Sequence, residues 1–416
     1  MRFSYGVVGS DGAPGNQYIY QQTYNQSGLY GFGETAPQTP ITGITEGTLG
    51  NPDVVWERDK KADLGIDMNL LHDKLSVTFD LFHDVRYDEF VIPGAIPEVL
   101  GVGVPYINAG RVSNHGYDGQ ISYHDNIGKV QYNASLVVSY AKNKILYEAE
   151  TQPAYPNLAR TGNPINQPFG YHFLNYYTQA QINQATTYIT THGNNAPVLQ
   201  NGKVVASDPI GVPAYADSPN GIATLHAGDL RYADLNGDGV IDANDQKAIG
   251  YPNLPNTSAG LTLGAAYKGF SISVLFQGSW NYSVIITGNG IEPFESQFQP
   301  IDLKAWTPAT AATAQFPRLS TNFSGTVDSP SGYPSDYWYI NARYLRLKTV
   351  DIGYQLPTNL LPFHVNNARI YLSAYNLFTW DNFSKKYQQD PEVSSNTAGD
   401  QYINARVLNL GIQLGF

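Results

Sequence analysis

Apolar and polar residues alternate with a period of two along many segments of this 416-residue chain. In the segment 62–70, for example, Leu64 and Ile66 occupy one set of alternate positions, and Asp63 and Asp67 occupy the other. Successive side chains of a β-strand point to opposite faces, so the pattern predicts strands with one apolar and one polar face. About ten segments share it, and they begin near positions 2, 56, 74, 112, 129, 258, 270, 342, 367 and 404.

The connections between these expected strands alternate between short and long. Short links lie around His72, Asn126, Lys268 and 357–366. Long links occupy 9–55, 89–111, 145–257, 285–341 and 381–403. Transmembrane β-barrels have short periplasmic turns and long extracellular loops, whereas a β-sandwich with Greek-key crossings has no reason to keep this order. We therefore expect an all-β fold, an antiparallel transmembrane β-barrel segment of about ten strands.

Aromatic content and the end of the chain agree with a barrel. The 31 Tyr and 17 Phe suit the aromatic girdles of the two membrane interfaces. The final alternating segment stops at Phe416, and a terminal aromatic residue is typical of barrel strands. No run of about 18 apolar residues predicts a spanning helix. The stretch 147–224, rich in Asn, Gln, Pro and Tyr, is long enough to form an extracellular loop or small subdomain.

Charge and cysteine content exclude several functions. The formal net charge is -11, so the chain offers no basic face for nucleic acid. It has no cysteine, which rules out disulfides, thiolate metal sites and a cysteine nucleophile.

The segment 234–245, DLNGDGVIDAND, has the ligand spacing of a calcium loop. Such loops place oxygen ligands at positions 1, 3, 5, 7, 9 and 12 and a glycine at position 6. The expected ligands are Asp234, Asn236, Asp238, the Val240 carbonyl, Asp242 and Asp245, with Gly239 at position 6. The flanking residues do not predict a pair of helices, so we expect a structural Ca²⁺ ion rather than a sensor. The alternative is a series of Asx turns that closes the loop without metal.

Signals for catalysis are weak. Ser139 and Lys142 have the spacing of a serine–lysine nucleophile but lie in an expected strand rather than at a helix start. Asp80, Asp84, Arg86 and Asp88 fall on the polar face of one strand, where a charged barrel lumen explains them better than paired catalytic carboxylates do. We expect no enzymatic activity.

Several long motifs resemble, in the same order, the C-terminal half of SusC-like (SusC/RagA) TonB-dependent outer-membrane transporters. They are NPDVVWERDKKADLGIDMNLLHDKLSVTFDLF (51–82), NAGRVSNHGYD (108–118), GDLRYADLNGDGVIDANDQKAIGYPN (228–253), ARYLRLKTVDIGYQLP (342–357), YLSAYNLFTW (371–380), DPE (390–392) and the final LGF. The resemblance covers most of the chain outside 147–224 and 285–332. NAGRVSNHGYD departs from the family's usual form at several positions.

The resemblance implies that residues 1–416 are the C-terminal part of a larger, plugged barrel in the outer membrane of a Gram-negative bacterium. It implies active import of glycans or peptides, energised through TonB, with a SusD-like surface lipoprotein over the extracellular loops. The expected partners are thus this lipoprotein, the TonB complex, outer-membrane lipid and a nutrient such as a glycan. The family's calcium-type loop maps onto Asp234, Asn236, Asp238, Asp242 and Asp245.

The chain shows no signal peptide, TonB-contacting segment or plug domain, so we expect a fragment or a truncated gene product. Ten strands of a larger barrel would leave open edges, which lipid does not tolerate. Two other functions stay open on the sequence alone. One is a secreted, calcium-dependent β-protein that binds carbohydrate or a partner; the other is a small stand-alone barrel that acts as a porin or adhesin.

Overall fold

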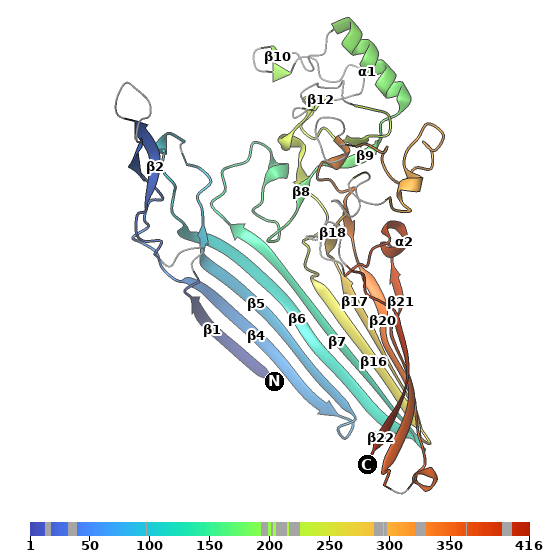
Figure 1. The fold of residues 1–416 in the computed structure, drawn as a ribbon. Helices are drawn as coiled ribbons and strands as arrows, with labels where there is room; N and C mark the ends of the chain where they lie inside the picture. The colour runs from blue at the N-terminus through green and yellow to red at the C-terminus, as the bar shows by residue number, and fades with distance from the viewer. Residues whose placement is uncertain are drawn as a thin grey trace.

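Ten long antiparallel strands form one sheet, in which strands that follow one another among the ten are neighbours (Figure 1). The structure is a computed structural model, and it describes residues 1–12, 18–31, 40–96, 98–192, 199–200, 203–204, 214–215, 225–286, 294, 298–321, 330–362, 364–392 and 402–416. The ten strands are β1 (Arg2–Ser10), β4 (Glu57–Leu70), β5 (Leu75–Val91), β6 (Ile107–Ile127), β7 (Val130–Tyr147), β16 (Thr257–Tyr267), β17 (Phe270–Trp280), β20 (Tyr344–Gln355), β21 (Asn367–Asp381) and β22 (Val407–Gly415). All ten expected strands are confirmed, with starts displaced by at most a few residues.

The register of the sheet separates an apolar face from a polar face. Leu64 pairs with Leu81, and Leu81 pairs with Tyr117, all on the apolar face. Asp80 pairs with Asp118 on the polar face. On the apolar face the ring of Tyr117 stacks on that of Tyr140, with 5.4 Å between their centroids. The alternation read from the sequence therefore describes the two faces of the sheet.

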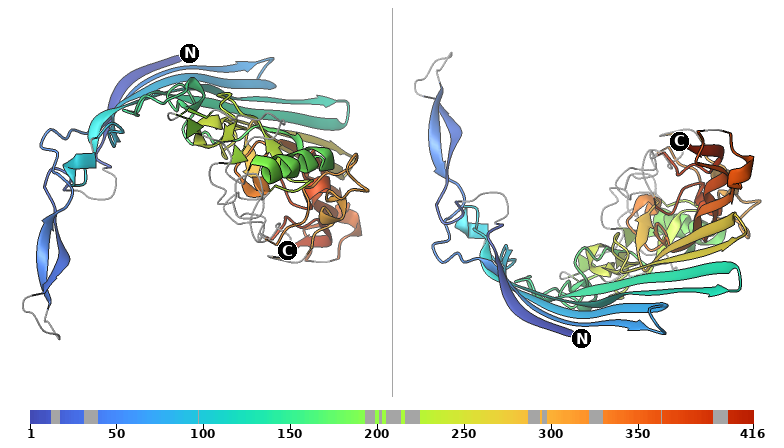
Figure 2. Two further views of the ribbon diagram at one scale, coloured as in Figure 1. Left: turned by 90° about the horizontal axis from the view of Figure 1, so that it is seen from above. Right: turned by 90° about the horizontal axis from the view of Figure 1, so that it is seen from below.

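The sheet is curved like part of a barrel wall. Seen along its strands it follows an arc, with the two chain termini at its opposite edges (Figure 2). Among the described residues, β1 pairs only with β4, and β22 pairs only with β21. The tight turns lie at one end of the strands and the long connections at the other (Figure 1). In the first turn Leu71, His72 and Asp73 have φ values of 56°, 56° and 66°, a left-handed stretch that reverses the chain within a few residues.

The connections carry shorter elements. The strands are β2 (Tyr24–Gly31), β3 (Pro40–Glu46), β8 (Phe169–Gly170), β9 (Phe173–Tyr176), β10 (Leu199–Gln200), β11 (Lys203–Val204), β12 (Ala214–Tyr215), β13 (Leu230–Tyr232), β14 (Val240–Ile241), β15 (Lys247–Ala248), β18 (Ser283–Ile285) and β19 (Tyr339–Asn341). The helices are α1 (Gln179–His192), α2 (Ser384–Tyr387) and the 3₁₀ turns Glu98–Leu100, Pro156–Leu158, Ala243–Asp245, Asp302–Lys304, Pro330–Gly332 and Thr358–Leu360. Neither α-helix in the described part of the chain combines the length and the apolar character needed to cross a membrane.

Three long connections pack together into what we call the cap, formed by the described residues of 148–256, 281–343 and 382–392. Its hydrophobic core joins residues far apart in sequence, among them Tyr177, Ile286, Trp338 and Phe383, all of which are 0–1% exposed. The helix α1 was missed from the sequence, although Ile182, Ala185 and Ile189 recur at helical spacing among its Asn, Gln and Thr residues. The proposed subdomain 147–224 stays a prediction, since much of it lies outside the described residues.

A buried arginine fastens the cap to the sheet. Arg346 of β20 is 1% exposed, and its guanidinium lies 2.7 Å from Asp390 and 2.8 Å from Glu392. Tyr344 donates a hydrogen bond of 2.5 Å to the other oxygen of Glu392. Burial alone would raise the pKa of Glu392, but this hydrogen bond and the cations Arg346 and Lys348 outweigh burial and lower it. Removing one member of such a buried pair costs about 3–5 kcal/mol.

Because the sequence predicts that lipid covers the apolar face, we expect Leu263→Lys to destabilise the barrel in a bilayer by about 2–4 kcal/mol, the cost of a lysine at a lipid-facing position near mid-membrane. Leu263 lies on the apolar face near the middle of β16, paired with Ala134 and Val274. The matched control is Thr262→Lys, one residue away on the polar face. Denaturant unfolding from phospholipid vesicles measures both, and equal losses would contradict the assignment of the two faces.

We expect acid to release residues 382–392 from the sheet. The folded-state pKa of Glu392 is below its ordinary value of 4.5. Its contribution to stability is therefore complete above that value and is lost as the pH falls through the lowered pKa. Pepsin cleavage of this segment, followed from about pH 5 down to about pH 2, should accelerate over this window. The variant Glu392→Gln should be cleaved fast over the whole pH range, and the control Glu46→Gln should be cleaved like the wild type. A wild-type cleavage rate that does not change with pH would contradict the role of Glu392.

Candidate functional site

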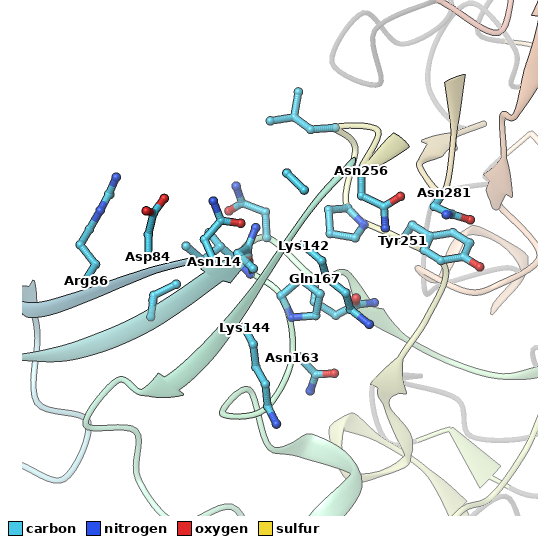
Figure 3. Close-up of a pocket in the computed structure, with 18 of the residues that line it drawn as sticks. Asp84, Arg86, Asn114, Lys142, Lys144, Asn163, Gln167, Tyr251, Asn256 and Asn281 are labelled. Carbon is cyan, nitrogen blue, oxygen red and sulfur yellow. The ribbon is translucent and has the colours of Figure 1, made fainter. Parts of the chain in front are cut away.

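A polar cavity lies where the sheet meets the cap. Its volume is about 920 Å³, and it opens between the cap-side ends of β4 to β7 and two loop segments, 162–167 and 250–256 (Figure 3). Its polar lining comes from Asp59, Lys61, Asp84, Arg86, Glu89, Asn114, Asn143, Asn163, Asn166, Gln167, Tyr251, Asn253, Asn256 and Asn281. Lys142 and Lys144 also border it, although they alternate with Asn143 along β7 and so stand on the opposite face of that strand. Amide side chains both donate and accept hydrogen bonds, so the lining can form hydrogen bonds with hydroxyl groups and with peptide groups.

The strand side of the cavity follows from the alternation of the sheet. Asp84 pairs with Asn114 and Asn114 pairs with Asn143, so the three side chains stand in a row on the polar face. Figure 3 shows Asp84, Arg86 and Asn114 pointing to the same side of the sheet. The row thus belongs to the polar face of the sheet and forms one side of the cavity.

Hydrogen bonds hold the loop side of the cavity. The Asn143 side chain accepts a 2.7 Å bond from the Ile165 amide. Gln167 donates a 2.8 Å bond to the Ile249 carbonyl, which ties the two loop segments together. Asn163 and Gly162 pair with the backbone of Ile145 and so extend the sheet beside β7. The cavity therefore has fixed walls on both sides.

Charges of both signs line the floor of the cavity. The Lys61 ammonium lies 3.3 Å from one oxygen of Asp59, and Arg86 lies 3.7 Å from Glu89. The other oxygen of Asp59 is buried and has no hydrogen-bond partner among the described residues. This part of the cavity can bind a polar solute through charge-assisted hydrogen bonds.

The polar face of β5 agrees with the sequence only in part. Asp80, Asp84 and Arg86 keep the alternation, and the sheet places Asp84 and Arg86 at the cavity. Asp88 breaks it, because β5 has a bulge there and Asp88 takes a φ of 57°. Its carboxylate instead lies 3.1 Å from Arg58. The prediction that Asp88 belongs to the row on the polar face is therefore wrong.

The predicted calcium loop, 234–245, lies in the cap as a series of backbone-bound carboxylates. Asp234 accepts hydrogen bonds of 2.7 Å from the amides of both Gly237 and Gly239. Asp238 accepts one of 2.9 Å from the Val240 amide. Gly239, at position 6, has a φ of 83°, which the sharp turn requires. The loop thus adopts the turn that its sequence predicts.

Two further carboxylates bind backbone amides at the C-terminal end of this loop. Asp245 is fully buried and accepts bonds from the amides of Leu235, Asn236 and Asp242. Burial raises the pKa of Asp245. Asp242 accepts a bond of 2.7 Å from the Asn244 amide.

The donor set of this loop fits calcium in its chemistry, because every side-chain ligand offers oxygen, which this ion prefers. Among the described residues, no three acidic or histidine side chains converge closely enough to hold a metal ion. Binding therefore requires the carboxylates to turn from the backbone amides toward one ion. The ligand assignment of Asp234, Asn236, Asp238, Val240, Asp242 and Asp245 stays a prediction.

The loop side of the cavity was missed by sequence reasoning. Asn163, Gln167 and Asn256 have no motif spacing of their own, and they come together only through the pairing of distant segments. The one available signal is the density of Asn, Gln and Pro in 162–168 and 252–256. Arg346 was also missed as an anchor, although its motif and DPE were both noted.

Comparison with known proteins agrees with the fold and its motifs. No family model matches the chain. TonB-dependent receptor P3 of Formosa agariphila is 26% identical over 98% of this chain and 39% of its own length. TonB-dependent receptor SusC of Bacteroides thetaiotaomicron is 24% identical over 100% of this chain and 37% of its own length. The chain therefore spans about two fifths of these relatives.

Solved structures give the same result for the fold. The RagAB peptide importer in its open-open state matches with a TM-score of 0.65 and 22% identity, over 100% of this chain and 40% of that one. These relatives carry the names of receptors and importers rather than of enzymes. The chain is therefore similar in sequence to TonB-dependent receptors, SusC among them, and its fold matches part of the RagAB peptide importer.

Proposed function

We propose that this chain forms part of the wall and cap of an outer-membrane active importer of nutrients in a Gram-negative bacterium. The imported solute is an oligosaccharide or a peptide. Transport is energised through TonB, and a SusD-like surface lipoprotein works with the cap. The cavity beneath the cap is the observation that carries the proposal, because it lies on the polar face of a barrel wall and bears groups that bind polar solutes.

The chemistry of the cavity supports solutes with many hydrogen-bonding groups. The side-chain amides of Asn114, Asn143 and Gln167 can form hydrogen bonds with sugar hydroxyls or with peptide groups. The charged side chains of Lys61 and Arg86 and their acidic partners can bind the charged ends of a solute. Its volume of about 920 Å³ is large enough for a short oligomer rather than a single ion.

The apolar face supports a membrane protein over a secreted binder. Large apolar side chains are exposed along it from edge to edge, for example Val7 at 53%, Leu136 at 40%, Leu372 at 46% and Leu410 at 78%. A soluble protein rarely exposes so broad an apolar surface, whereas lipid covers it in a barrel. This surface disfavours the secreted calcium-dependent alternative.

Uptake by cells that produce the gene product containing this chain tests the proposal. We expect Arg86→Ala with Asn114→Ala to reduce uptake of a labelled oligosaccharide or peptide about tenfold or more, since each lost polar contact costs about 1–3 kcal/mol. Ser113→Ala is the matched control, because Ser113 is the neighbour of Asn114 on the apolar face. Uptake that survives both cavity substitutions, or that continues after the proton gradient is dissipated, overturns the proposal.

We also propose that the loop 234–245 binds one Ca²⁺ ion that stiffens the cap. The ligands are Asp234, Asn236, Asp238, the Val240 carbonyl, Asp242 and Asp245. The buried carboxylate of Asp245 supports this, because a cation offsets the cost of keeping that charge away from water. Asn157 donates to the carbonyls of Asn244 and Gln246, so an ordered loop would also order the segment around Pro156–Leu158.

Thermal unfolding with and without calcium tests this second proposal. We expect calcium to raise the midpoint of the wild type, with stabilisation that grows with the ratio of ion concentration to dissociation constant. Asp234→Ala and Asp238→Ala should abolish the shift. Asn244→Ala, at a position in the same loop that is no ligand, should keep it. If calcium shifts none of these proteins, or all of them equally, the loop does not bind the ion.

A further inference from the structure

Basic side chains cluster on the apolar face near the cap end of β4 to β7. His83 pairs with His115, and His115 pairs with Lys142, so these three form one row across three strands. In the next row toward the cap, Lys60 pairs with Val85, Val85 with Ser113, and Ser113 with Lys144. Lys60 and Lys144 therefore stand at the two ends of one row. We call Lys60, His83, His115, Lys142 and Lys144 the outer basic patch. Adjacent strands lie about 4.8 Å apart, so each row spans only about 10–15 Å.

The outer basic patch is exposed, and its lysines form no ion pair with the described acidic residues. All five side chains belong to exposed residues. Neighbouring ion pairs use Arg58 with Asp88 and Lys61 with Asp59, and none joins a lysine of the patch to a carboxylate among the described residues. The remaining apolar-face positions of the two rows are Ala62, Val85 and Ser113. In a chain with a net charge of -11, this grouping is a local excess of positive charge.

An apolar groove adjoins the patch on the side toward mid-membrane. It has a volume of about 380 Å³. Its apolar-face lining comprises Phe3, Ala62, Leu64, Leu81, His83, His115, Tyr117 and Tyr140. The two histidines therefore belong both to the groove and to the lower row of the patch. A hydrocarbon chain can lie against the leucines and rings while a charged head reaches the lysines.

We propose that this surface binds a phosphorylated lipid of the outer leaflet. The phosphate is held by Lys142, Lys144 and Lys60, with hydrogen bonds from His83 and His115, and an acyl chain occupies the groove. Juxtamembrane lysines attract anionic headgroups by about 1 kcal/mol each. A free phosphate would use the lysines but leave the groove empty, so the pairing of patch with groove favours the lipid.

This inference rests on the proposed membrane location of the apolar face. The gene product that contains this chain is reconstituted into phosphatidylcholine vesicles and then titrated with lipid A, either phosphorylated or dephosphorylated. Bound lipid is counted by native mass spectrometry, and inorganic phosphate serves as the competitor. Lys142→Gln with Lys144→Gln should weaken binding of phosphorylated lipid A about 30-fold, as expected from two lysines.

Two controls separate the parts of the site. Lys61→Gln with Arg86→Gln removes two charges from the polar face of the same strands and should leave lipid binding unchanged. Ala62→Phe fills the groove without a change in charge and should weaken both forms of lipid A. Equal binding by wild type and the Lys142/Lys144 variant overturns the inference, as does full competition by millimolar phosphate.

Failure of the lipid site and failure of the proposed importer give different experimental results. If the wild type enters vesicles and imports its solute but shows no preference for phosphorylated lipid A, only the lipid site is wrong. If it does not enter vesicles at all, the membrane location fails and the lipid site fails with it.

Discussion

Backbone hydrogen bonding is the constraint on which this structure depends. In lipid an unpaired amide or carbonyl has no water to replace its partner, so every strand within the membrane must pair with a neighbour. The paired backbone then forces side chains to alternate between lipid and lumen. One register fixes both the apolar face that carries Leu64 and Leu81 and the polar row of Asp84, Asn114 and Asn143. The apolar face and the polar cavity are therefore two results of the same ladder of backbone hydrogen bonds.

The strands could be predicted from sequence because this constraint acts locally. Each strand carries its own period-two pattern, and turns such as 71–74 separate the patterns cleanly. The bulge at Asp88 escaped prediction, since nothing in the alternation marks one extra residue. The calcium-type loop was found because its ligand spacing lies within twelve consecutive residues.

The cap and the cavity could be predicted far less. Gln167 reaches Ile249, and Arg346 reaches Asp390 and Glu392, so the partners stand tens of residues apart. Such pairs have no fixed spacing, and a single sequence holds no sign of which distant loops meet. The motifs containing Arg346 and DPE could be recognised by resemblance, but their shared role became visible only when β20 and the segment after β21 were placed together.

The hydrophobic core of the cap has a consequence for the order of assembly. Its members Tyr177, Ile286, Trp338 and Phe383 come from connections that follow β7, β17 and β21. None of these connections can bury its share alone, and closing such long loops before the strands align is entropically costly. We therefore expect the cap to form only after the strands from β7 to β21 have paired. A folded cap would then indicate that this part of the sheet is complete.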